Sequence, residues 1–132
     1  MSQYFVMVKI HDRMRLMRLS DIREVVSLMA LTELDGQHGG TCRGVANLRG
    51  EMIPVFDMAG AGAPLTPTRV IVIARIGRDH VGLLVDDVPD VIGISEDRVA
   101  VRNVGGGRTS TMVRMDDVVM TVMEPVDAIG TD

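Results

Sequence analysis

Aromatic residues are nearly absent from this chain of 132 residues, which has one tyrosine, two phenylalanines and no tryptophan. Few side chains are therefore available for the base stacking on which single-stranded nucleic-acid binders depend. Contacts to phosphates require an excess of basic residues, whereas this chain has a net charge of −4 and a pI near 5.3. We therefore expect no nucleic-acid partner.

Cysteine is equally scarce, because Cys42 is the only one in the sequence. A single thiol excludes an internal disulfide and a thiolate zinc cage. His38 lies four residues before Cys42, but a zinc site needs three or four ligands and a cysteine nucleophile needs a base with its own orienting group. The sequence marks no third candidate, so we expect no metal, no cofactor and a reducing, cytoplasmic setting.

Long hydrophobic runs are also missing, since none approaches the roughly 18 to 20 residues that cross a bilayer. The first residues, M-S-Q-Y-F-V-M-V-K, lack the basic region and cleavage site of a signal peptide. We expect neither export nor direct insertion into a membrane. The sequence does contain 46% hydrophobic residues, enough for an ordinary core, and eleven methionines that can fill irregular gaps in it.

Short apolar runs separated by turn signals predict a mainly β protein with little helix. A short helical turn capped by Ser20 is expected at 20–24, and a mobile loop at the glycine-rich segment 103–111. The expected strands are 4–10, 14–19, 45–48, 52–56, 70–76, 81–85, 99–102 and 118–123.

The strand pattern repeats at a single offset of 66 residues, which lays 4–10 over 70–76, 19–28 over 85–94 and 51–56 over 117–122. We interpret the chain as one domain with two similar, interlocked halves, approximately 1–66 and 67–132. The Gly-, Ala- and Pro-rich segment 58–68 is the expected linker. About five strands per half suit a small barrel, and two such barrels can share one apolar interface.

The segment 44–57 reads G-V-A-N-L-R-G-E-M-I-P-V-F-D and predicts a β-hairpin with Arg49 at its tip. Gly50 can adopt the positive φ of a tight turn. The guanidinium of Arg49 offers five donors and a permanent charge, which suits recognition of a carboxylate or carbonyl on a partner. The repeat places Met115-Asp116 where Arg49-Gly50 stand, so folding of such a hairpin does not require Arg-Gly, and a recognition role is favoured.

The densest acidic cluster consists of Asp86, Asp87 and Asp90. Clustered carboxylates can bind a divalent cation, so a small metal-dependent hydrolase is an alternative function. The repeat counterparts are Ser20, Asp21 and Glu24, which favours capping or solvent exposure for acids at these turns.

Three blocks resemble the CheW-like domain family, the adaptors of bacterial chemosensory arrays: the hairpin segment 44–57, R-V-I-V-I-A-R-I-G at 69–77 and V-G-L-L-V-D-D-V-P-D-V-I at 81–92. The resemblance implies two five-stranded SH3-like barrels packed on a shared apolar interface, with no catalytic activity. It also implies a scaffold that couples the cytoplasmic tips of chemoreceptors to the regulatory domain of a CheA-type histidine kinase at the inner face of the membrane, with other CheW-like proteins as further partners. By the same resemblance, the protein-binding residues are Ile22, Glu24, Val25, Asn47, Arg49, Gly50, Val88 and Val91.

The sequence departs from the family pattern at several places. The linker lacks the usual basic and leucine residues, Leu34-Asp35-Gly36 replaces a proline-containing segment, and no glycine is present at 112–114. The usual C-terminal helix is not expected either. These departures concern kinase coupling more than receptor binding, so the alternative within the family is a receptor-only adaptor that competes with or modulates kinase coupling in a pathway unrelated to swimming.

Overall fold

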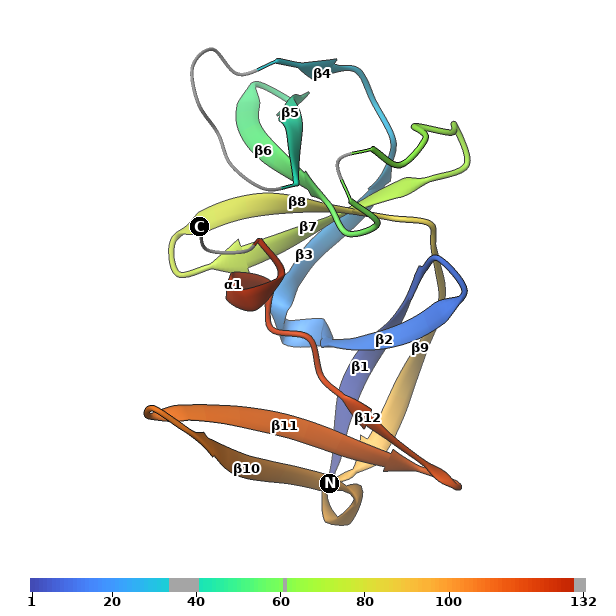
Figure 1. The fold of residues 1–132 in the computed structure, drawn as a ribbon, viewed down its shortest axis with the longest axis vertical. Helices are drawn as coiled ribbons and strands as arrows, with labels where there is room; N and C mark the ends of the chain where they lie inside the picture. The colour runs from blue at the N-terminus through green and yellow to red at the C-terminus, as the bar shows by residue number, and fades with distance from the viewer. Residues whose placement is uncertain (34–40, 61, 130–132) are drawn as a thin grey trace.

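The computed structural model describes residues 1–33, 41–60 and 62–129, and these residues are mostly strand and turn (Figure 1). Helix in this described part of the chain is limited to two 3-10 turns, η1 (Leu19–Asp21) and η2 (Glu96–Arg98), and one short α-helix, α1 (Pro125–Ala128). The mainly β class with little helix is thus confirmed. The strands are β1 (Ser2–Ile10), β2 (Arg13–Arg18), β3 (Ile22–Ser27), β4 (Leu31–Thr32), β5 (Cys42–Leu48), β6 (Glu51–Asp57), β7 (Val70–Ile76), β8 (Asp79–Val85), β9 (Asp87–Ser95), β10 (Val99–Gly105), β11 (Arg108–Met115) and β12 (Val118–Thr121).

Two β-subdomains lie one above the other in Figure 1. The upper subdomain contains β3 to β8, which form one six-stranded sheet in the order β3-β7-β8-β6-β5-β4. The lower subdomain contains β1, β2 and β9 to β12, which form two three-stranded sheets, β2-β1-β9 and β10-β11-β12. The predicted pair of small barrels is therefore confirmed, with six strands in each subdomain instead of five.

Each subdomain combines strands from both halves of the sequence. β3 pairs with β7, so that Val25 lies opposite Val72. β9 pairs with β1, so that Val91 lies opposite Val6. The third strand of each half thus crosses to the hairpin of the other half. The halves interlock, and the expectation that each half forms its own barrel is corrected.

The sequence repeat is present in the structure for most of its length. At an offset of 66 residues, β1 corresponds to β7, β2 to β8 and β3 to β9. The hairpin β5–β6 corresponds to β11–β12 at an offset of 67, because the two turns occupy 49–50 and 116–117. The single ungapped offset was therefore wrong for this hairpin, and Asp116-Asp117 stands where Arg49-Gly50 stands in the upper subdomain.

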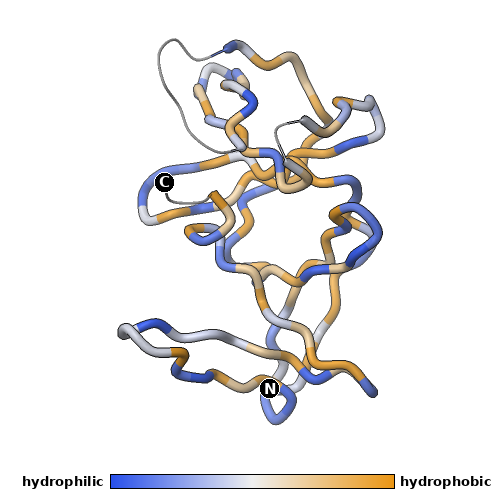
Figure 2. Tube along the Cα trace, in the orientation of Figure 1, coloured by the Kyte–Doolittle hydropathy of each residue, from blue (hydrophilic) through white to orange (hydrophobic). Residues whose placement is uncertain are grey.

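Three apolar clusters fill the molecule, and one of them joins the two subdomains. In the shared cluster, Val8 and Met17 of the lower subdomain pack with Leu83 and Val85 of the upper subdomain. Figure 2 shows hydrophobic residues along the strands that cross the centre of the molecule and hydrophilic residues at the hairpin tips. The other two clusters lie within one subdomain each, around Ile53, Ile71 and Ile73 in the upper one and around Phe5, Leu16 and Val113 in the lower one.

Two local expectations are corrected by the structure. The glycine-rich segment is a hairpin between β10 and β11, whose turn uses the positive φ angles of Gly105, Gly106 and Gly107. Ser20 is not a helix cap, because η1 begins at Leu19 and its N-cap, Arg18, makes no side-chain capping hydrogen bond. The helical turn expected at 20–24 is present as η1 at Leu19–Asp21, but it ends before Ile22, where β3 begins.

Candidate protein-binding site

The predicted hairpin turn is formed by Arg49 and Gly50 between β5 and β6. Both residues have positive φ, 52° for Arg49 and 91° for Gly50, which is the combination that a tight hairpin of this kind requires. The backbone N–H of Gly50 donates to Oδ1 of Asn47 at 2.8 Å. Asn47 therefore fixes the turn from the preceding strand, and the turn holds the Arg49 side chain outside the barrel.

Arg49 reaches across to β3, where its Nη2 donates to Oε2 of Glu24 at 2.6 Å. The Arg49 side chain is 62% exposed and that of Glu24 is 27% exposed. The pair is therefore accessible from solvent, and the remaining guanidinium donors of Arg49 are available to a partner. Four of the predicted site residues, Glu24, Asn47, Arg49 and Gly50, are brought together in this way.

Three further charged or titratable side chains extend this pair. Arg23 Nε lies 3.3 Å from Oε2 of Glu24, and Arg23 Nη1 donates to Oε1 of Glu51 at 2.6 Å. His80 Nδ1 lies 2.8 Å from Oε2 of Glu51. The pKa of Glu51 is held below its ordinary value of 4.5, first by the hydrogen bond from Arg23 and then by that from His80. The result is a continuous network from β8 through β6 and β3 to the Arg49 turn.

Sequence reasoning did not find Arg23, Glu51 or His80. Arg23 stands next to Glu24, and Glu51 follows Gly50, but adjacent strand residues normally point to opposite faces. A register shift between Ile22 and Glu24 in the β3–β7 pairing changes that alternation locally. Only the three-dimensional register of β3, β6 and β8 brings the three side chains together.

The four predicted aliphatic site residues differ in exposure. Val25 on β3 and Val91 on β9 are 41% and 49% exposed. Ile22 is only 8% exposed and belongs to the shared core, and Val88 is partly buried against the same core. Ile22 and Val88 therefore contribute to the core shared by the subdomains, whereas Val25 and Val91 remain on the surface.

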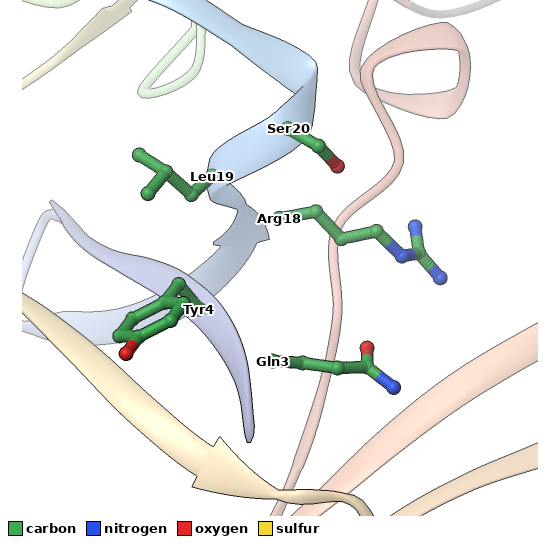
Figure 3. A pocket seen from close by; sticks show the side chains of 5 residues that line it. All are labelled: Gln3, Tyr4, Arg18, Leu19 and Ser20. Atoms are coloured by element: carbon green, nitrogen blue, oxygen red, sulfur yellow. The ribbon is translucent and has the colours of Figure 1, made fainter. Parts of the chain in front are cut away.

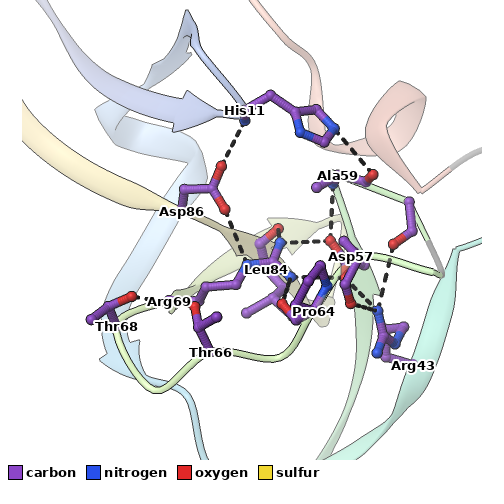
Figure 4. Close-up of polar contacts among 12 residues, drawn as sticks. His11, Arg43, Asp57, Ala59, Pro64, Thr66, Thr68, Arg69, Leu84 and Asp86 are labelled. Carbon is purple, nitrogen blue, oxygen red and sulfur yellow. Dashed lines mark hydrogen bonds and ion pairs between the residues drawn. The ribbon is translucent and has the colours of Figure 1, made fainter.

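The three carboxylates of the acidic cluster all accept hydrogen bonds from backbone N–H groups. Asp86 Oδ2 accepts from the backbone N of His11 at 2.6 Å, and its Oδ1 lies 3.2 Å from Nε of Arg69 (Figure 4). Asp87 and Asp90 each accept from the backbone N of the next residue at 2.8 Å. Within the described residues no group of three His, Cys, Asp or Glu side chains is placed to hold a metal ion. His38 and Leu34-Asp35-Gly36 lie outside the described residues.

A buried charge network lies beneath the segment between β6 and β7 (Figure 4). Asp57 is fully buried, and its carboxylate accepts from Arg69 at 2.6 and 2.9 Å and from Arg43 at 2.7 Å. The two arginines also donate to the carbonyls of Ala63 and Pro64. The network thereby anchors this segment to the upper barrel, and the sequence had marked none of its members.

A shallow cavity of about 380 Å³ opens on the lower subdomain, between the start of β1 and η1. Tyr4 and Leu19 point to one side of it, and Gln3 and Arg18 point to the other (Figure 3). Arg18 is held there by Glu124 and by Thr111, whose Oγ1 is 2.7 Å from Nη2.

A membrane-spanning helix must be both long and apolar, and none of the helices in the part of the chain that the structure covers meets these two conditions.

Known proteins resemble this chain in sequence and in fold. The family model described as the CheW-like domain matches residues 4–129. A probable chemotaxis protein CheW of Rhizobium etli is 34% identical over 92 residues, 61% of this chain and 59% of that protein. The chemotaxis protein CheW of Rhizobium meliloti is 33% identical over 91 residues, 60% of this chain and 59% of that protein. The matched region thus spans less than two thirds of each relative.

Among solved structures, the scaffolding protein TtCheW from Thermoanaerobacter tengcongensis superposes on the structure with a TM-score of 0.76. The alignment covers 95% of this chain and 86% of that chain at 23% sequence identity. This similarity shows that the two proteins share a fold.

Proposed function

This chain belongs to the CheW-like domain family, and we propose that it is a non-enzymatic, cytoplasmic adaptor of a bacterial chemosensory array. In this role it couples the cytoplasmic tip of a chemoreceptor to the regulatory domain of a CheA-type histidine kinase, and other CheW-like proteins are further partners. The observation that carries the proposal is the Arg49–Glu24 pair, presented by a tight turn on one side and an edge strand on the other.

The turn itself supports a recognition role for Arg49. A non-glycine residue with positive φ costs roughly 1 kcal/mol or more, and Asn or Asp tolerates this conformation better than Arg. The corresponding turn of the lower subdomain has Asp116 at the same place, with a φ of 51°. The upper turn thus has a residue that is less suited to the backbone but carries a long, charged, five-donor side chain.

The side chains around the Arg49–Glu24 pair are suited to binding the side of a helical chemoreceptor tip. Val25 and Val91 offer exposed aliphatic surface on β3 and β9, Ile22 belongs to the apolar core that the two subdomains share, and Val88 packs against that core. In the proposed complex these aliphatic side chains contact the apolar face of an amphipathic receptor helix, while charge-assisted hydrogen bonds from Arg49 and Glu24 fix its register. The kinase regulatory domain would bind at a separate surface.

A pull-down with two purified fragments tests the proposal: a chemoreceptor tip and a kinase regulatory domain. The chain is expected to retain both fragments, singly and together. Retention of the receptor tip alone supports the alternative of a receptor-only adaptor. Retention of neither fragment rejects the adaptor function.

Arg49→Ala tests the site. We expect at least about tenfold weaker binding of the receptor tip, measured by titration calorimetry, because the side chain carries the partner-facing charge. The free energy of unfolding should change by less than about 0.5 kcal/mol, as for other exposed positions. Arg78→Ala is the matched control, because Arg78 is an exposed arginine in the β7–β8 turn. Equal receptor affinity of Arg49→Ala and Arg78→Ala would show that Arg49 does not contribute to receptor binding.

A further inference from the structure

Among the described residues, a single bridge closes the lower barrel between β2 and β12. Leu16 and Val122 form an isolated parallel bridge, and the backbone N of Met123 donates to the carbonyl of Leu16 at 2.7 Å. In the residues that precede Leu16 and Val122, a groove of about 570 Å³ separates the two strands. The groove is lined by Arg13, Met14 and Arg15 of β2 and by Val118, Val119, Met120 and Thr121 of β12.

Both walls of the groove present unpaired backbone groups. The N–H of Val122 points to β11, where it bonds to Thr111, and the N–H of Met123 points to β2. Because these directions alternate along a strand, the N–H and C=O of Val119 also point towards β2. By the same alternation, Met14 directs its backbone groups outward, as Leu16 does. A strand inserted in the groove would find hydrogen-bond partners on both sides.

The side chains of the groove differ between its two faces. Arg13 and Arg15 lie opposite Ile10 and Val8 on β1 and so share one face of the sheet, while Met14 lies on the other. Met14 is joined on its face by Val118 and Met120, which alternate with Val119 along β12. Met14 is 39% exposed and Val118 is 57% exposed. One face of the groove is therefore aliphatic, and the other combines the two arginines with Val119 and Thr121.

The two arginines have no charged partner in the structure. Among the described residues, neither Arg13 nor Arg15 takes part in an ion pair. Asp12 and Asp117 are close in sequence, but neither lines the groove. The groove itself is lined by two arginines and no acidic side chain, although Asp12 shares a neighbouring hollow with both arginines and Glu124 and Asp127 share another with Arg15. An occupant with carboxylates on one face would complement the two arginines.

In the upper subdomain a side-chain contact spans the equivalent gap. The positions that correspond to Met14 and Val118 are His80 and Glu51, and His80 Nδ1 lies 2.8 Å from Glu51 Oε2. A polar side-chain contact thus spans β8 and β6 at the place where the lower subdomain has two separated aliphatic side chains. The backbones of β6 and β8 are not paired at this place either, since their parallel pairs begin at Val55 and Gly82, so the two subdomains differ here in the side-chain contact.

We propose that the β2–β12 groove accepts an extended segment of a partner protein as an added strand, with aliphatic side chains on one face and acidic side chains on the other. A second copy of this chain could not supply this pattern through the same two strands, because neither β2 nor β12 contains an acidic residue. The groove lies in the lower subdomain and the Arg49 turn in the upper one, so the proposal does not rest on the adaptor function.

The test uses the full chain and a synthetic ten-residue peptide of alternating valine and glutamate, with a valine–lysine peptide as the charge control. We expect the glutamate peptide to bind and the lysine peptide not to bind, measured by fluorescence anisotropy. The double variant Arg13→Glu/Arg15→Glu should weaken binding of the glutamate peptide at least tenfold. Equal binding of the two peptides, or binding that survives the charge reversal, would overturn the proposal.

Val119→Pro tests whether the occupant pairs as a strand. Proline removes an N–H that faces the groove and is tolerated on an edge strand, whereas Val119→Thr keeps the donor and is the matched control. We expect at least tenfold weaker peptide binding for the proline variant and little change for the threonine variant. If the proline variant fails to fold, slower amide hydrogen exchange at Met14 and Val119 of the parent on peptide addition is the readout.

Three results would count against strand addition. The first is no detectable binding of the glutamate peptide by the parent protein. The second is unchanged amide exchange at Met14 and Val119 on peptide addition. The third is a concentration-dependent dimer, detected by sedimentation, that Val119→Pro abolishes, because the groove would then be occupied by a second copy of the chain.

Discussion

The upper and lower subdomains have corresponding strands but differ in how completely they close. In the upper subdomain, β6 and β8 form three consecutive parallel pairs, from Val55 opposite Gly82 to Asp57 opposite Leu84. In the lower subdomain, the corresponding strands β12 and β2 share the single bridge between Val122 and Leu16. A common strand plan can therefore give a continuous sheet in one place and a partly open barrel in another.

One pair of corresponding residues contributes to this difference. A Cβ added to Gly82 would lie 3.0 Å from Val55 Cγ2 and 2.8 Å from Ile71 Cγ2, so the missing side chain allows close approach of these neighbours. Leu16 occupies the corresponding place in the lower subdomain, and its whole side chain is buried in the lower core. The upper barrel brings its strands together around a glycine, whereas the lower barrel fills the same place with a leucine.

A second difference concerns the carboxylate that follows the closing strand. Asp57 and Glu124 correspond at the offset of 67 residues, and each accepts hydrogen bonds from arginine. The Asp57 side chain is 0% exposed and is shared by two arginines, whereas the Glu124 side chain is 28% exposed and bonds to Arg18. The same kind of contact is thus buried in one subdomain and near the surface in the other.

The largest effect should come from Asp57→Ala. It leaves the buried Arg69 and the mostly buried Arg43 without their carboxylate, and removing one partner of a buried ion pair costs about 3–5 kcal/mol. Glu124→Ala is the matched variant in the lower subdomain and should cost about 1 kcal/mol or less, because solvent replaces much of the lost contact. Urea unfolding monitored by circular dichroism measures both. Similar losses in the two variants would mean that burial does not distinguish these contacts.

Gly82→Ala should have the next largest effect. The added methyl group would contact Ile71 and Val55 at distances shorter than side chains normally allow, so we expect a loss of about 1–3 kcal/mol in the free energy of unfolding. Gly62→Ala is a suitable control, since a Cβ there meets no atom within 4 Å. If Gly82→Ala unfolds at the same urea concentration as the control, close approach at Gly82 is not what holds β6 against β8.

Much of the fold could be predicted because its signals are local. The strand 70–76 was predicted with its exact limits, since a run of aliphatic residues there is bounded by turn signals. The Arg49-Gly50 turn was found because glycine between two apolar runs identifies a tight hairpin without knowledge of its neighbours. β3 and β9 were missed as strands, because acids and small residues interrupt their apolar pattern and Pro89 lies within β9.

The pairing of strands and the charge networks were not predictable in the same way. Even where periodicity identifies a strand, it does not say which hairpin that strand will join. The contact of Arg23 with Glu51 and His80 depends on the register of three strands that are distant in sequence. The same holds for Asp57 and Arg69, which meet only after the segment between β6 and β7 has folded back.

The smallest effect should be a difference in pH dependence between two carboxylates. Burial is the main cause that raises the pKa of Asp21, at the end of η1, above its ordinary value of 3.8, and its Oδ2 has no hydrogen-bond partner among the described residues. In the upper subdomain, the hydrogen bonds from Arg23 and His80 lower the pKa of Glu51. Folding therefore disfavours the charged form of Asp21 and favours the charged form of Glu51.

These opposite shifts predict opposite effects of neutral substitutions. Glu51 stabilises the fold above pH 4.5, and this contribution is lost as the pH falls through its lowered folded pKa, so Glu51→Gln should reduce stability at pH 7 and converge with the parent in acid. Asp21 destabilises the fold above its raised folded pKa, so Asp21→Asn should increase stability at pH 7, and the gain should disappear as the pH falls towards 3.8 and below. Urea unfolding of the two variants and the parent from pH 7 to pH 3 measures both trends. Changes of the same sign at pH 7 would show that the surroundings of the two carboxylates do not differ in this way.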